Sequence, residues 1–398
     1  MDHDSTAAQD TAPIRIAPPE PTAPGTRPPK RRAAVRVGVP VAVAAAVATG
    51  IGLVPALASD EAPDLPAISA QDLVAKALAA DTDTFSGTVR ISADLGLPTA
   101  LTDAAGGSGP LGRLARGAGA EVGGAAPQLK AVELLGGSHT LSVAADGPDR
   151  QKVVLAGDGS GYELLHDGTQ LWAYDRASRQ ALHYTAPAAA GHERPSGIDS
   201  FTPQEVAGRF LAESSATTDV TVGGTERVAG HDAYRLSVKP KQAGSTIQEV
   251  RISIDAEKGV PLAVQVRTVD GATALDVRFG TLSYAKPDAG TFRFAAPKGT
   301  EVTEAGADAF SAGPLSSALP ERPAANDGGA AAIGEGWTTV LHGDAGADAA
   351  GALAKFAGRH VDGGTLVSTR IVNALVTDDG RIYLGAVTPE TLQKAARN

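Results

Sequence analysis

The chain has 398 residues, of which 42% are apolar and only 4% are aromatic, so its core must be built mainly from Ala, Val and Leu. It contains no cysteine, which excludes disulfides, thiol catalysis and thiolate metal sites. The net charge of −10 argues against nucleic-acid binding, because neutralising phosphates requires clustered Lys and Arg.

An apolar segment at residues 37–58 separates a basic flank from an acidic one. As a helix it is long enough to cross the roughly 30 Å hydrocarbon core of a membrane. It could be a retained membrane anchor or a cleaved signal segment, since Ala56-Leu57-Ala58 offers the small residues that a signal peptidase prefers. A core helix is disfavoured because the segment has no apolar stripe.

The charge distribution predicts the orientation of this segment. The cations of residues 27–36 are expected on the cytoplasmic side. Residues 1–36 are rich in Pro and Ala, which predicts a disordered cytoplasmic tail. We therefore predict a single-pass protein of the cell membrane with residues 59–398 on the extracytoplasmic side, or a secreted protein if it is cleaved after Ala58.

The first elements after this segment are a helix and a strand. Ser69 and Asp72 form a capping-box-like start for a helix over residues 69–80. The stretch GTVRISADLGL at residues 87–97 alternates apolar and polar residues, as a half-buried strand does. Residues 98–129 are rich in Gly and Ala, which favours a surface loop, with a lid over a pocket as the alternative.

Two series of short strands follow, separated by a helix. Residues 138–185 hold HTLSVAA, QKVVLAG, YELLH, QLWAY and QALHYT between turn signals such as Asp167-Gly168. Thr202 and Pro203 begin a helix over residues 203–214. The second series is DVTVGG, HDAYRLSVKP, EVRISIDA, PLAVQVRTV, ALDVRFGTLSYA and TFRFAAP.

This pattern predicts a mainly β (α+β) fold. About ten antiparallel strands with one apolar face must curl, and the two helices are the candidates to cover that face. We expect a half-open antiparallel β-barrel at residues 65–300. Residues 301–335 lose periodicity and are predicted to be a linker. Residues 336–398 are predicted to form a small C-terminal α+β domain, with a helix near 345–358 and another beginning at Thr388.

No motif for catalysis is visible. No two histidines have metal-ligand spacing, GDGSGY at residues 157–162 lacks the first Gly of a nucleophile elbow, and RGAGAEVGG at 116–124 follows no strand. Isolated strand histidines such as His231 are more often satisfied structural residues than ligands. We therefore predict a protein that is not an enzyme and has no catalytic residue, metal site or cofactor.

Several motifs resemble the LolA/LppX/RseB superfamily. They are the D-G-x-x-x-W-x-Y run with Asp167, Gly168, Trp172 and Tyr174, the strand from Val228 to Leu236, and the turn from Ile254 to Leu262. The likeness covers roughly residues 65–300, and GAVTPETLQKAA near the C-terminus resembles the end of the smaller domain of MucB/RseB sensors. It implies a half-open barrel with helices over an apolar cavity. Unlike lipid-anchored members, this chain has no lipobox cysteine.

The topology and the resemblance together predict a membrane-tethered, extracytoplasmic protein that binds lipid or lipoprotein acyl chains and relays the state of the cell envelope. The alternative is an RseB-type regulatory module that acts on a membrane anti-sigma factor or a similar partner, and so on sigma-factor activity. No nucleic-acid partner is expected. If the host cell has no outer membrane, delivery of lipoproteins to that membrane is excluded, and lipid handling or signalling are the functions that are left.

The predicted ligand-binding residues are the apolar positions of the strands and of the second helix, although an ordinary core would have the same pattern. They are Val89, Ile91, Leu95, Leu141, Val143, Val154, Trp172, Phe210, Leu211, Leu236, Ile252, Val264, Val266 and Phe279.

Overall fold

The computed structural model describes residues 62–96, 136–157, 161–186, 214–306, 331–344 and 358–397, and scattered positions at 125–127, 130, 133–134, 211–212 and 310. These residues belong to one compact unit, Asp60–Asn398. Their strands form two separate sheets, one large and one small.

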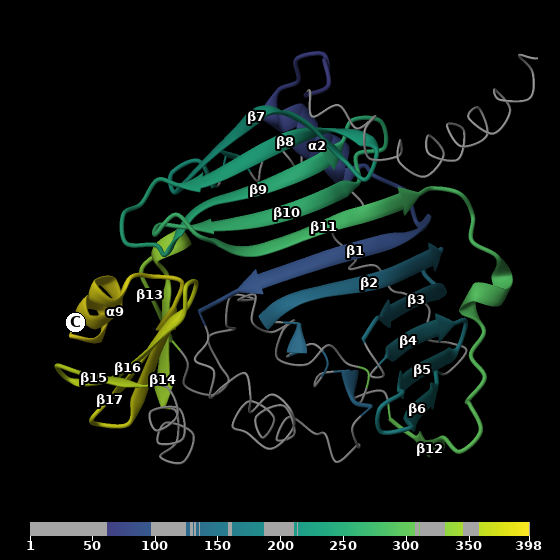
Figure 1. Cartoon of the computed structure of the whole chain (residues 1–398). Coiled ribbons are helices and arrows are strands. Elements are labelled where there is room, and N and C mark those ends of the chain that lie inside the picture. The colour runs from purple at the N-terminus through teal and green to yellow at the C-terminus, as the bar shows by residue number, and fades with distance from the viewer. Residues whose placement is uncertain are drawn as a thin grey trace, which may run out of the picture. The chain divides into compact units, whose positions relative to one another are not determined.

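The large sheet has 12 strands in the order β12-β6-β5-β4-β3-β2-β1-β11-β10-β9-β8-β7, as Figure 1 shows. Its strands are β1 Thr84–Asp94, β2 Gly136–Asp146, β3 Arg150–Leu155, β4 Tyr162–Asp167, β5 Gln170–Asp175, β6 Gln180–Thr185, β7 Thr218–Val228, β8 His231–Pro240, β9 Ile247–Asp255, β10 Pro261–Thr268, β11 Thr273–Ser283 and β12 Glu301–Glu304.

The sheet consists of two antiparallel meanders joined through β1. Strands β2–β6 and β7–β11 each follow chain order, and β1 pairs with both β2 and β11. Among the described strands, β12 and β7 are edges that do not pair with each other, so the sheet is not closed into a barrel. The mainly β class predicted from the sequence is confirmed, whereas the half-barrel curvature stays a prediction.

Helix α2, Ala70–Leu78, covers one end of the apolar face. The Ser69 hydroxyl accepts a 3.0 Å hydrogen bond from the backbone N–H of Asp72, so the predicted cap forms. Leu73 is fully buried against Tyr234 and Leu236 of β8, and Figure 1 shows the helix lying on β7 and β8. The helix therefore buries its apolar side on one half of the sheet.

Two segments differ from the sequence prediction. TFRFAAP at residues 291–297, expected as a strand, begins in the short 3₁₀ helix Ala289–Phe292 and forms no strand after it, and Phe292 is fully buried. The adjacent Phe294 packs against Trp172 and Tyr174, which lie on β5. Glu301–Glu304, within the predicted linker, is strand β12 and pairs in parallel with β6. The short polar stretch Glu301–Glu304 has no apolar alternation that would predict a strand, and its partner β6 is more than 100 residues away in sequence.

The small sheet has six strands in the order β13-β14-β18-β17-β16-β15 and is covered by α9, Pro389–Ala396. Its strands are β13 Ala331–Ile333, β14 Val340–Asp344, β15 Arg359–Val361, β16 Gly364–Ser368, β17 Asn373–Thr377 and β18 Arg381–Gly385. The predicted boundaries of the domains are not tested by these elements and stay a prediction.

Contacts join segments next to the small sheet to strand ends and a turn of the large one. The guanidinium of Arg370 forms ion pairs with Asp94 at 3.1 Å and Asp270 at 2.8 Å. The indole N–H of Trp337 donates a 2.8 Å hydrogen bond to the hydroxyl of Thr218. Charged and polar side chains therefore hold the two sheets together.

The predicted single-pass membrane localisation is corrected here. No helix in the part of the chain that the structure describes is long and apolar enough to cross a membrane. The segment 37–58, on which that prediction depended, lies outside the described residues, as do the tail 1–36, the helix predicted near 345–358 (apart from residue 358) and most of the helix predicted at 203–214.

Candidate functional site

The pairing of the strands brings most of the predicted ligand-binding residues onto one face of the large sheet. Directly opposed residues of antiparallel strands project from the same face. Leu236, Ile252, Val264, Val277 and Ile91 oppose one another in turn across β8, β9, β10, β11 and β1. These five residues are named the apolar row.

Further predicted residues lie beside the apolar row on the same face. Val89 opposes both Phe279 and Leu141, and Val266 opposes Val250. Val143 lies two residues beyond Leu141 and so projects the same way. The sequence alternation therefore identified a continuous apolar face that spans both meanders.

Burial along this face is uneven. Leu236 at one end is buried with α2, and Leu141 is buried with Tyr162 and Leu182 at the other. The residues between them, including Val264 and Ile91, are half-buried. The middle strands thus present partly accessible apolar side chains between two packed clusters.

Two predicted residues project from the opposite face. Val154 opposes Ser142, whereas its neighbour Leu155 opposes Leu141 and packs on the apolar face. Trp172 stacks on His183 with ring centroids 4.0 Å apart and contacts Phe294. A short strand that is apolar on both faces cannot be assigned a direction from sequence alone, and Phe292 and Phe294 explain why this second face is also apolar.

The remaining predicted residues lie outside the strands. Leu95 is half-buried after the end of β1, and its carbonyl accepts a 2.7 Å hydrogen bond from the backbone N–H of Arg370. Leu211 is helical and half-buried. Phe210 lies outside the described residues.

The end of the predicted loop 98–129 covers part of the apolar face. Ala125 and Ala126 are buried, and the hydroxyl of Tyr162 donates a 3.0 Å hydrogen bond to the Ala125 carbonyl. Burial, assisted by the charge of Asp175, raises the pKa of Tyr162, so its phenol remains a donor at neutral pH. This end of the segment is packed on the sheet, whereas the sequence favoured a surface loop. The difference arises because a run of Ala and Gly has the same composition in a buried segment as in a surface loop.

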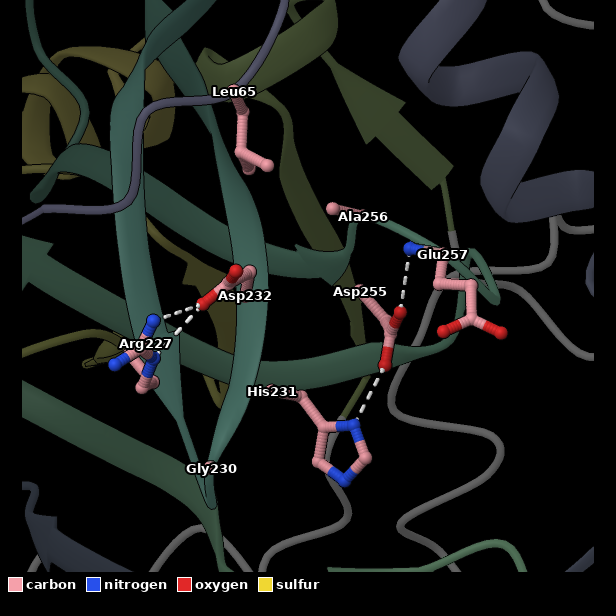
Figure 2. Close-up of a pocket in the computed structure, with 8 residues that line it drawn as sticks. All are labelled: Leu65, Arg227, Gly230, His231, Asp232, Asp255, Ala256 and Glu257. Atoms are coloured by element: carbon pink, nitrogen blue, oxygen red, sulfur yellow. Dashed lines mark hydrogen bonds and ion pairs between the residues drawn. The ribbon is translucent and has the colours of Figure 1, made fainter. Parts of the chain in front are cut away.

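A second feature is a polar pocket with a volume of about 530 Å³ at one end of β7, β8 and β9. Figure 2 shows the residues that line it: Leu65, Arg227, Gly230, His231, Asp232, Asp255, Ala256 and Glu257. The Arg227 guanidinium lies 2.8 Å from a carboxylate oxygen of Asp232. These lining residues carry no hydroxyl, thiol or amine, and their candidate reactive groups are the carboxylates of Asp232, Asp255 and Glu257 and the imidazole of His231.

The Asp255 carboxylate is the most buried charge of this pocket, with 2% of its surface exposed. It accepts hydrogen bonds from the backbone N–H groups of Glu257 and Lys258 at 2.7 and 2.8 Å. The Tyr284 hydroxyl donates to it at 2.7 Å, and Nδ1 of His231 lies 3.4 Å away. These donors satisfy the carboxylate, and the second ring nitrogen of His231 lies 3.3 Å from the Leu282 carbonyl oxygen, so both nitrogens of the ring have a neighbour.

The sequence did not identify this pocket, because its residues come from the β7–β8 turn, the end of β9 and the segment around Leu65. That segment is fastened by two hydrogen bonds: Thr225 donates to the Pro63 carbonyl at 2.7 Å and Tyr234 to the Pro66 carbonyl at 2.8 Å. Among the described residues, no group of three His, Asp or Glu side chains could hold a metal ion.

Comparison with protein-family models and with curated protein sequences finds no match. Solved structures with similar folds include the MucA/MucB complex of Pseudomonas aeruginosa, whose matched chain is 14% identical with a TM-score of 0.38 and covers 82% of this chain and 96% of its own. A LolA superfamily protein from Nitrosomonas europaea is 12% identical with a TM-score of 0.20, covering 57% and 99%.

A putative outer membrane lipoprotein-sorting protein domain from Vibrio parahaemolyticus is 11% identical with a TM-score of 0.21, covering 56% of this chain and 95% of its own. At these identities and TM-scores the matches carry no argument about this chain.

Proposed function

We propose that the protein is an extracytoplasmic binding protein that receives an apolar chain, such as the acyl chain of a lipid or lipoprotein, on the apolar face of the large sheet. The observation that supports this is the apolar row, in which Ile252, Val264, Val277 and Ile91 are half-buried while both flanks of the face are packed.

The energetics favour an extended hydrocarbon as the ligand. Each CH₂ group that leaves water contributes about 0.8 kcal/mol, so a chain that covers several half-buried residues gains several kcal/mol before the entropic cost of binding. The row crosses five adjacent strands, which lie about 4.8 Å apart, and its length of roughly 20 Å suits a long acyl chain. Curling of the sheet into a half-barrel, as the resemblance implies, would deepen the site.

The proposal is for binding without catalysis. The apolar face holds no polar side chain in the row itself. The polar pocket lies at the end of β7–β9 and its charges are already paired. The carboxylates of the pocket are held by neighbouring backbone N–H groups and cations, which supports a role in stability rather than in chemistry.

A regulatory interaction module is the second candidate. The observation that favours it is the attachment of the small sheet to the large one through Arg370, Asp94 and Asp270, which gives ligand binding on the large sheet a route to a surface on the small one. A similar fold is known from a complex of MucA with MucB. In this case the partner would be a membrane regulatory protein.

The proposal is tested by native mass spectrometry of the full chain, purified from a bacterial envelope without strong detergent, followed by titration of the delipidated protein with a fluorescent fatty acid. The matched variants are Ile91→Asn, in the apolar row, and Ser92→Asn, the next residue on the opposite, exposed face. We expect Ile91→Asn to weaken binding about tenfold, or roughly 1.4 kcal/mol, and Ser92→Asn to leave it unchanged.

Equal binding by both variants, with unchanged thermal unfolding, would contradict an acyl-chain site on this face. A clean protein mass with no fatty-acid binding, together with capture of a defined membrane protein that depends on residues 336–398, would favour the regulatory module instead.

A further inference from the structure

The polar face of the large sheet carries an irregularity between β1 and β11. The register of the two strands shifts between Thr88 and Val89, because Thr88 opposes Thr281 while Val89 opposes Phe279. Gly280 is therefore an extra residue on β11, which is the arrangement of a β-bulge. Bulges redirect side chains, and a Gly inside a strand often marks a place where another group approaches the backbone closely.

Two arginines lie directly opposite each other beside this bulge, Arg90 on β1 and Arg278 on β11. Like charges in this position destabilise a sheet unless each is neutralised. Asp276 neutralises Arg278 through two hydrogen bonds, of 2.8 Å to Nε and 3.0 Å to an outer nitrogen. Arg90 is exposed and, among the residues that the structure describes, forms no ion pair.

The space next to Arg90 is bounded by groups that can donate hydrogen bonds. A Cβ atom placed on Gly280 would lie 3.0 Å from the hydroxyl oxygen of Thr88 and 3.4 Å from Nε of Arg90, so the absence of a side chain there leaves both groups open. The hydroxyls of Thr88 and Thr281 are 2.9 Å apart and share one hydrogen bond. When Thr281 is the donor of that hydrogen bond, the Thr88 proton is available to a ligand.

We propose that Arg90, Arg278, Thr88 and Gly280 form a binding site for an oxyanion, a phosphate or a carboxylate group, on the face opposite the apolar row. Guanidinium groups bind such anions through paired, charge-assisted hydrogen bonds. Because Asp276 already pairs with Arg278, an anion here acts mainly as the partner of Arg90, and the missing Cβ of Gly280 lets it approach the backbone. The group can belong to a phosphorylated ligand or to an acidic side chain.

The site is tested on the full chain labelled with ¹⁵N-arginine, by following the Nε–H resonances during titration with sodium phosphate and, separately, sodium acetate at constant ionic strength. We expect saturable shifts of Arg90 and Arg278 with at least one of the two anions. A response to phosphate alone identifies a phosphorylated ligand, and a response to acetate identifies a carboxylate.

Three variants separate a built site from general charge attraction. Arg90→Gln removes the free cation and Gly280→Ala fills the space without changing charge, and each should raise the Kd about tenfold or more. Arg267→Gln removes one charge elsewhere on the large sheet, away from Gly280 and 3.8 Å from Glu249, and should change the Kd less than about twofold. Shifts that do not saturate with either anion, or equal effects of Arg90→Gln and Arg267→Gln, would overturn the proposal.

Discussion

The hydroxyl of Tyr284, just after β11, donates a 2.7 Å hydrogen bond to the buried carboxylate of Asp255 at the end of β9. Burial and the hydrogen bond to this carboxylate raise the pKa of Tyr284, so the phenol keeps its proton throughout the physiological range. Because His231 on β8 also faces Asp255, one carboxylate joins the ends of three strands.

Removing this donor should destabilise the protein. Tyr284→Phe leaves Asp255 with one acceptor site less satisfied, and we expect a loss of about 1–2 kcal/mol in the free energy of unfolding, measured by urea denaturation. Asp232→Asn, which removes an exposed ion pair with Arg227, should cost less than about 1 kcal/mol. Equal losses of unfolding free energy in the two variants would show that the buried hydrogen bond contributes no more to stability than the exposed ion pair.

Glu249 should make the stability of the protein depend on pH. Burial opposes ionisation of its carboxylate, but hydrogen bonds from Ser237 and Arg251 and the charges of Arg251 and Lys239 outweigh it, so the pKa of Glu249 is lowered. A lowered folded-state pKa gives stability that is present above the unfolded pKa of about 4.3 and is lost as the pH falls through the folded value.

The corresponding variant is Glu249→Gln, compared with the wild type by urea denaturation at several pH values. We expect the wild type to be the more stable protein at pH values above about 5, and the difference to shrink as the pH falls below about 4. A difference that stays constant across this range would mean that the charge of Glu249 contributes nothing to folding.

The turn between β9 and β10 should tolerate no side chain at Gly259. This residue has a φ of +75°, and a Cβ there would lie 2.5 Å from the backbone carbonyl oxygen of Lys76 in α2. Gly271, in the next turn, between β10 and β11, has a φ of +85° and open space around its Cβ position. The two positions share the backbone strain and differ in the contact with α2.

We therefore expect Gly271→Ala to cost about 1 kcal/mol from the left-handed backbone alone, and Gly259→Ala to cost at least 2 kcal/mol more as α2 is displaced. Thermal unfolding of the two variants measures the difference. If α2 is displaced, trypsin should also cleave after Lys76 faster in Gly259→Ala than in Gly271→Ala. Similar stability of the two variants would contradict the prediction, because it would mean that α2 can move away from residue 259 without a loss of stability.

Arg370 should control the attachment of the small sheet. Arg370→Met removes both ion pairs while keeping an apolar stem, and we expect faster hydrogen exchange at the backbone N–H of residue 370, which donates to the Leu95 carbonyl. Arg359→Met, on an exposed strand of the same sheet, is the matched control. Unchanged exchange at residue 370 in both variants would assign the attachment to Trp337 and the neighbouring loops instead.

Sequence alternation was sufficient to predict the strands and most of the apolar face, because Val89, Ile91 and Val264 alternate with polar residues in long strands. It was insufficient for Val154 and Trp172, because apolar residues occur on both faces of the short strands β3 and β5. Trp172 also packs against Phe294, which is distant in sequence, and this contact cannot be predicted from the alternation of a strand. The polar pocket and the bulge at Gly280 depend on strand register, which single-sequence patterns do not determine.

The pairing of β1 with β11 also has a consequence for how the protein is made. Thr88 and Thr281 are 193 residues apart, yet their side chains touch at the middle of the sheet. At roughly 5–20 residues per second, a ribosome needs on the order of 10–40 s to synthesise the interval between them. Throughout that time the β1 edge that β11 will occupy has no partner, so the meander β2–β6 can form early while the two halves join last. A chaperone that shields unpaired strand edges would therefore be expected to act on this chain during that interval.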